Sequence, residues 1–204
     1  MKKLFLFAIL LIAAFALYWF KFRPTEPTTP DQPKQAAITV KKHSEAFNKS
    51  VDSVINSYLA IKDALVNEDS VKAKVDGIAF VELLNHFPID ELKKDTSSIF
   101  ETAQANVGDM KSNAESLTKQ TTIDEMRKDF SMVTEMMYPS FFKAINYEGQ
   151  KLYYTNCPMA FDNQGANWIS NSAQILNPYM GKVHPKYKSS MLGCGEVKDS
   201  IEAK

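Results

Sequence analysis

Apolar side chains recur at intervals of three and four residues between about residues 43 and 141, which is the spacing of one helix face. The first run predicts a helix over 43–67 and consists of Phe47, Val51, Val54, Ile55, Tyr58, Leu59, Leu65 and Val66. Ser70 is the predicted N-cap of a second helix, which reaches about His86 and ends before Pro88.

Two more helices complete this pattern. The third is marked by Ile99, Phe100, Ala103, Val107, Met110, Ala114 and Leu117. Thr122, with Glu125 three residues later, predicts a capping box that opens the fourth helix, which we expect to be kinked at Pro139. Because Met126, Met132, Met136 and Met137 follow helical spacing, we interpret them as core residues rather than as a copper-binding face. Four helices with short connections predict an antiparallel up-down four-helix bundle.

The last third of the chain has a different pattern, because five of the seven glycines lie after residue 148. Residues 151–155 predict a short strand and residues 166–175 a short helix that contains Trp168, while the remainder predicts irregular loop. Ten of the 23 aromatic residues lie between Tyr138 and Tyr187. We therefore expect an all-α fold with an irregular, aromatic-rich C-terminal segment packed on the bundle.

The N-terminus predicts export. Residues 4–20 are uniformly apolar or aromatic and follow two lysines, which indicates either a cleaved signal peptide or an uncleaved signal anchor. Residues 24–37 contain four of the nine prolines and predict an extended linker. The expected organisation is thus a signal segment over 1–23, the linker, and one helical domain over 38–204. We expect a periplasmic location with the protein anchored to the inner membrane.

Charge and motifs exclude two classes of function. The first 23 residues hold four of the 24 basic side chains, so the rest of the chain carries 20 basic against 24 acidic residues. This mildly acidic body lacks the basic surface that nucleic-acid binding requires. The sequence also contains no nucleophile elbow and no phosphate-binding glycine loop, so we expect no enzymatic activity.

Both cysteines lie in the C-terminal third, and each has a methionine close by, in Cys157-Pro158-Met159 and Met191-Leu192-Gly193-Cys194. Thiolate and thioether ligands together select Cu(I) over harder cations, so these four residues are candidate ligands. His184 is the one histidine near them in the sequence. Alternatively, two cysteines in an exported protein form a single disulfide, which would stabilise the fold by roughly 3 to 4 kcal/mol. The residue types leave both interpretations open.

A series of short motifs carries a resemblance to a known family. They are Cys157-Pro158-Met159-Ala160, Gly165-Ala166, Trp168-Ile169-Ser170, Asn177-Pro178-Tyr179 and Cys194-Gly195-Glu196-Val197. Together with Tyr58-Leu59 and Arg127 in the helical part, they resemble the domain-of-unknown-function family numbered 3347. Members of that family are exported helical domains and are also found fused to periplasmic adaptor subunits of copper and silver efflux pumps.

The resemblance implies a role in copper handling. The candidate metal ligands are Cys157, Met159, Met191 and Cys194, with Met180 and His184 as weaker candidates. Our leading hypothesis is a membrane-tethered periplasmic module that binds Cu(I) or Ag(I), either to buffer it or to pass it to an efflux adaptor or another copper-handling protein. The alternative is a metal-free helical interaction module that a Cys157–Cys194 disulfide staples.

Overall fold

The computed structural model describes residues 18, 21 and 42–201. The chain divides into two units, Met1–Thr39 and Val40–Lys204, and the fold below is that of the second. The predicted signal segment, apart from two helical residues, and the predicted linker over 24–37 lie outside the described residues. Among the residues that are described, no helix has both the length and the apolar character needed to cross a membrane.

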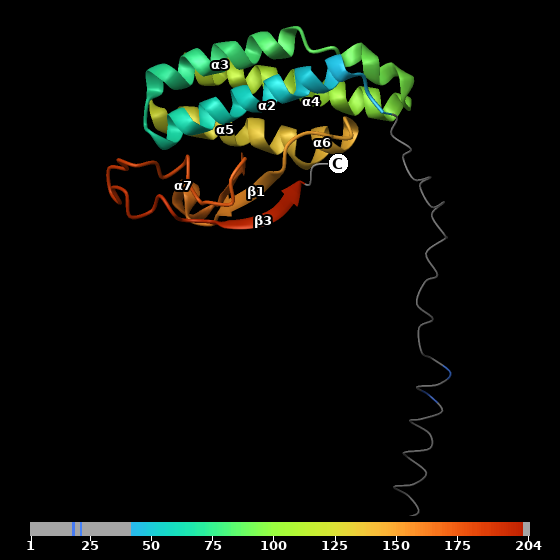
Figure 1. Cartoon of the computed structure of the whole chain (residues 1–204). Helices are drawn as coiled ribbons and strands as arrows, with labels where there is room; N and C mark the ends of the chain where they lie inside the picture. Colours follow the sequence, from blue (N-terminus) through green and yellow to red (C-terminus); the bar gives the residue numbers. More distant parts are fainter. Residues whose placement is uncertain (1–17, 19–20, 22–41, 202–204) are drawn as a thin grey trace, which may run out of the picture. The chain divides into compact units, whose positions relative to one another are not determined.

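Four long helices form most of the second unit, and each packs against the next in the chain (Figure 1). They are α2 (Glu45–Val66), α3 (Ser70–Asn85), α4 (Ser97–Lys119) and α5 (Ile123–Met136). A short 3-10 helix, η1 (Ile89–Lys94), joins α3 to α4. The prediction of four packed helices is therefore confirmed.

Local capping fixes where these helices begin. The Thr122 hydroxyl accepts a hydrogen bond from the Glu125 backbone N–H at 3.3 Å, as the predicted capping box requires. The second helix begins one residue earlier than we predicted, because the Asp69 carboxylate, and not Ser70, accepts from the Lys72 N–H at 2.8 Å. Regular helix ends at Met136, just before Pro139, at the place where the sequence predicted a kink.

The chain then forms a π turn, η2 (Met137–Phe141), and a short helix, α6 (Phe142–Ala144). The all-α prediction is wrong beyond this point, because the C-terminal part contains a three-stranded antiparallel sheet in the order β2-β1-β3. The strands are β1 (Leu152–Cys157), β2 (Ala166–Ser170) and β3 (Glu196–Ile201). A single turn, α7 (Ala160–Asn163), connects β1 to β2.

The predicted helix over 166–175 is thus a strand, and β3 lies in a segment that we predicted to be irregular. In β2, Trp168 pairs with Thr155 and Ala166 pairs with Cys157 of β1. This pairing supplies the backbone hydrogen bonds that a helix would have made, and Trp168 is buried in the same step. β3 is largely exposed and polar, so it has none of the apolar alternation by which strands are recognised.

The sheet and the bundle share one hydrophobic core, which runs from Phe47 in α2 to Met180 in the C-terminal segment. β2 contacts both α5 and α2. The Tyr58 hydroxyl joins the two layers: it lies 2.7 Å from the Thr134 hydroxyl on α5 and accepts a hydrogen bond from the Ile169 N–H at 3.1 Å. The predicted apolar face of α2 is buried at every position, so that part of the prediction is confirmed.

Candidate functional site

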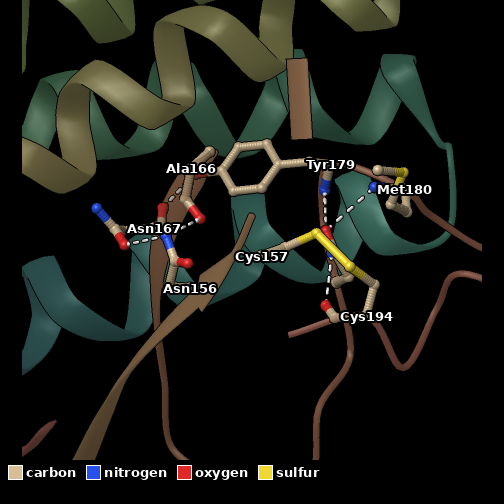
Figure 2. The surroundings of a disulfide bond; sticks show 8 residues. Asn156, Cys157, Ala166, Asn167, Tyr179, Met180 and Cys194 are labelled. Atoms are coloured by element: carbon tan, nitrogen blue, oxygen red, sulfur yellow. Dashed lines mark hydrogen bonds between the residues drawn. A yellow bond between two sulfur atoms is a disulfide. The ribbon is translucent and has the colours of Figure 1, made fainter. Parts of the chain in front are cut away.

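The two cysteines form a disulfide at the junction of the sheet and the C-terminal loop (Figure 2). Cys157 is the last residue of β1 and is fully buried, whereas Cys194 is half-buried and directly precedes Gly195 and β3. Their Cα atoms are 5.7 Å apart, although 37 positions separate them in the sequence. In this oxidised state neither sulfur is a thiolate, which is the form that binds a metal ion.

Asn177 connects the backbone next to Cys194 to the turn that Asn177 itself begins. Its side-chain amide donates to the Cys194 carbonyl at 2.8 Å, and its side-chain oxygen accepts from the backbone N–H groups of Tyr179 (2.8 Å) and Met180 (3.1 Å). Its own N–H donates to the Leu192 carbonyl at 2.9 Å. Because Asn177 is fully buried, these bonds satisfy polar groups that water does not reach.

A buried arginine joins the same loop to the bundle. Arg127 on α5 is 1% exposed, and its Nε donates to the Pro178 carbonyl at 2.8 Å. Its two terminal nitrogens bind the carboxylates of Asp124 at 3.0 Å and Glu68 at 3.1 Å. The guanidinium therefore ties α5, the α2–α3 connection and the C-terminal loop together.

The close approach of the loop to this arginine requires a glycine. Gly181 has a φ of +60°, and a Cβ atom there would lie 2.6 Å from both a terminal nitrogen of Arg127 and a carboxylate oxygen of Glu68. The next residue, Lys182, donates its backbone N–H to the Val66 carbonyl at 2.9 Å. A side chain at position 181 would push the loop away from the bundle.

A groove of about 830 Å³ opens between α5 and the C-terminal segment. The α5 side includes Lys128, Asp129 and Met132, and the opposite side includes Met159, Phe161, Asp162, His184 and Tyr187. Tyr179 and Met180, both buried, line it as well. Burial raises the pKa of the Tyr179 phenol well above its usual value, so its hydroxyl remains a neutral donor to the Asn167 carbonyl.

The candidate metal ligands lie at the disulfide and along the groove, and Met180 lies beside both (Figure 2). Cys157 and Cys194 are bonded to each other, and Met191 lies one turn before Cys194, whose N–H donates to the Met191 carbonyl at 2.9 Å. Met159, 40% exposed, lines the groove together with Met180 and His184. Across the described part of the chain, no group of three or more His, Cys, Asp or Glu side chains is arranged to hold a metal ion.

The hydrogen bonds of His184 constrain any role as a ligand. Its Nδ1 lies 3.2 Å and 3.3 Å from the backbone nitrogens of Lys186 and Tyr187 and accepts from both N–H groups. The neutral ring then carries its proton on Nε2. Coordination through Nε2 would require that proton to move to Nδ1 and would break both hydrogen bonds.

The methionines of α5 do not all lie in the core. Met126 in α5 and Met137 in η2 are buried, as helical spacing predicted, and Met136 is half-buried against the core. Met132 is 47% exposed and lines the groove, so the prediction of core packing is wrong for this residue. It lines the groove on the α5 side together with Lys128 and Asp129.

Asn177 and Arg127 belong to the motifs that resemble the family, but the sequence predicted no role for either residue. A charged residue next to Met126, on a helix with an apolar stripe, is a weak signal of a buried ion pair, because exposed arginines are far more common at such positions. An asparagine before proline ordinarily indicates a turn, and Asn177 does form one with Tyr179. Its bond to Cys194, 17 residues later, has no local signal.

Comparison with known proteins gives one match. Neither the curated proteins nor the solved structures contain a match to this chain. The model of the family described as "Protein of unknown function (DUF3347)" matches residues 54–147, from within α2 to the residues that follow α6, and ends before Cys157. The four-helix part of this chain, over residues 54–147, is accordingly a domain of the DUF3347 family.

Proposed function

We propose that this protein is an exported interaction module whose C-terminal segment is stapled to the helical bundle by the Cys157–Cys194 disulfide. The observation that carries the proposal is the bond itself, between a fully buried Cys157 and a cysteine 37 positions away. Disulfides of this kind persist in oxidising compartments such as the periplasm. The apolar run over 4–20 and the proline-rich residues 24–37 agree with a domain held near the outer face of the inner membrane.

The thiol status of the exported chain tests this proposal. The full chain is exported to a bacterial periplasm, purified without reductant, unfolded in a chelator, alkylated and weighed by intact mass spectrometry. We expect the unreduced chain to carry no alkyl groups. A reduced sample is the matched control and should carry two. Two alkyl groups in the unreduced sample would overturn the proposal, since a structural staple would then be absent.

The stability of a Cys157→Ser/Cys194→Ser variant gives a second test. Its free energy of unfolding should be lower by roughly 3 to 4 kcal/mol, because the unfolded chain loses a constraint across the loop between the two residues. A Ser189→Ala/Ser190→Ala variant within that loop is the control, with little expected change. Urea unfolding of both variants measures the difference.

A second candidate function is the binding of Cu(I) or Ag(I) in the reduced protein. The specific observation in its favour is that Cys157 and Cys194 already lie within bonding distance, so reduction would leave two thiolates side by side near Met191. Thiolates and thioethers prefer these soft ions. In this role the protein would buffer the ion or pass it to the periplasmic adaptor of an efflux pump.

Titration with Ag(I) separates the two candidates. If soft-metal binding is the function, the reduced chain binds Ag(I) tightly, the oxidised chain does not, and the Cys157→Ser/Cys194→Ser variant loses the tight site. Affinity should also fall as the pH is lowered, because protons compete for the thiolates. Equal binding by the reduced chain and the double variant would remove the cysteines as ligands.

A further inference from the structure

The groove between α5 and the C-terminal segment combines exposed apolar side chains with an unusual backbone. Met132 on α5 is 47% exposed and Met159 on the opposite side is 40% exposed, so two large apolar side chains line the same groove from its two sides. Unbranched, polarisable methionine side chains adapt their shape to an incoming apolar surface. The volume of about 830 Å³ is large enough to take several side chains of a partner.

The segment after Met159 is held in a left-handed conformation. Phe161, Asp162 and Asn163 have φ values of +50°, +55° and +69°. Apart from glycine, Asp and Asn adopt such angles most readily, so the unfavourable conformation falls mainly on Phe161, and three such residues in succession are rare. The turn sets the Phe161 ring edge-on against Tyr179, with 5.2 Å between ring centroids, and leaves Asp162 exposed at the groove. Unfavourable backbone of this kind concentrates at binding sites.

The charged side chains along the groove indicate which sign of charge a bound partner should carry. Arg127 is shared between Asp124 and Glu68, so these three groups retain one negative charge. Lys128 pairs with Glu125 at 2.8 Å. Asp129 accepts a hydrogen bond from the neutral amide of Gln120 at 2.8 Å, which does not cancel its charge.

On the other side of the groove, Asp162 and Lys186 contribute one charge of each sign. The surplus therefore lies along α5, at Asp124, whose side chain is 71% exposed, and at Asp129. This arrangement favours a partner that brings positive charge to the α5 side while its apolar side chains contact the two methionines.

We propose that this groove is a docking site for a basic amphipathic helix of a partner protein. The apolar face of that helix would lie on Met132, Met159 and Phe161, and its lysines or arginines would approach Asp129 and Asp124. This is the helix-in-groove mode of recognition, with affinity from apolar contact and selectivity from charge. The inference rests on the proposed interaction function and adds to it a surface and a class of partner.

Fluorescence anisotropy of a labelled peptide tests the docking site on the purified full chain. The probe is an amphipathic helical peptide of leucine and lysine, and its matched control has glutamate at every lysine position. We expect the basic peptide to bind about tenfold or more tightly than the acidic one and to bind more weakly as salt is added. Equal binding of the two peptides, or binding of neither, would overturn the proposal.

Two pairs of variants locate the binding. Asp129→Lys in the groove should weaken the binding of the basic peptide about tenfold. Glu101→Lys makes the same change of charge at an exposed site on α4 and should have little effect. Met132→Ser/Met159→Ser should weaken it similarly, with Val71→Ser/Val75→Ser on the exposed side of α3 as the control. The four variants change six positions, all exposed except the half-buried Asp129, and thermal unfolding checks that each variant folds.

Equal effects within a pair would place the peptide elsewhere and contradict the docking site. The mass measurement of thiol status remains a separate result: free thiols with groove-specific peptide binding would remove the staple and leave the docking site. A disulfide without groove-specific binding would support the staple and contradict the docking site.

Discussion

Different kinds of contact stabilise the helical bundle and the loops of the C-terminal segment. In the bundle, stability comes from apolar faces that repeat at helical spacing, as in α2, where Phe47, Ile55 and Leu65 are all buried. In the C-terminal segment, the contacts that fix the loops are polar or covalent: the Asn177 hydrogen bonds, the Arg127 ion pairs and the disulfide. The first kind of stabilisation is spread over many residues, whereas the second depends on a few.

This difference has a consequence for mutation. Loss of one buried polar group leaves its partners without hydrogen bonds, whereas loss of an exposed polar residue leaves its partners in contact with water. Substitutions of the buried polar residues that hold the C-terminal loops should therefore cost far more than matched substitutions of exposed polar residues. Two substitutions test this expectation.

Arg127→Leu should have the largest effect, lowering the free energy of unfolding by about 3 kcal/mol. The variant removes the donors to the Pro178 carbonyl and leaves Glu68, whose side chain is 18% exposed, without its partner. Lys128→Leu is the matched control, because the neighbouring lysine forms an exposed pair with Glu125, and its loss should cost less than about 1 kcal/mol. Urea unfolding measures both. Similar losses for the two variants would mean that Arg127 contributes no more than a surface ion pair.

Asn177→Ala should follow, with a loss of roughly 2 kcal/mol. The side chain of Asn177 makes three hydrogen bonds to the backbone around the disulfide, and no water reaches them once the amide is gone. Asn85→Ala at the exposed end of α3 is the control and should change stability little. If thermal unfolding shows equal stability for Asn177→Ala and the wild type, the loop is held by the disulfide and Arg127 alone.

The same contrast explains what could be predicted from sequence. The period of the apolar residues depends only on local geometry, so the four helices and most of their buried faces were predictable. The strand β2 was not, because Trp168 and Ile169 suit a helix or a strand, and the choice depends on pairing with β1. β3 was missed because its side chains are largely exposed and polar.

The candidate site was predictable only in its residue types. The proximity of two cysteines in the chain's last third to methionines was visible, and the residue types predicted either a disulfide or a soft-metal site without deciding between them. Met132 shows the limit of periodicity, since helical spacing predicts a core position and the structure leaves it 47% exposed beside the groove. Spacing identifies a helix face but not whether another element covers it.

The contact between the two regions should also weaken at alkaline pH, which is the smallest effect we predict. Tyr138, in η2, donates a hydrogen bond to Asp199 on β3, and desolvation together with this carboxylate raises the pKa of its phenol to about 12. In the unfolded chain the phenol ionises near its usual value of 10.0. The unfolded state therefore releases its proton first, so the stability that this group contributes is complete below pH 10 and is lost as the pH rises toward 12.

Urea unfolding at several pH values above 9 should thus show a falling free energy of unfolding in the wild type and a shallower fall in Tyr138→Phe, because the variant has no phenol at this position to ionise. Tyr58 and Tyr179, whose pKa values are also raised by burial, remain in the variant and account for a residual slope. Identical slopes in the two proteins would mean that the Tyr138–Asp199 contact is not kept in solution. The junction between bundle and sheet would then depend on the buried Tyr58 bridge, and the exposed strand β3 would be held by its pairing with β1 and by the disulfide just before it.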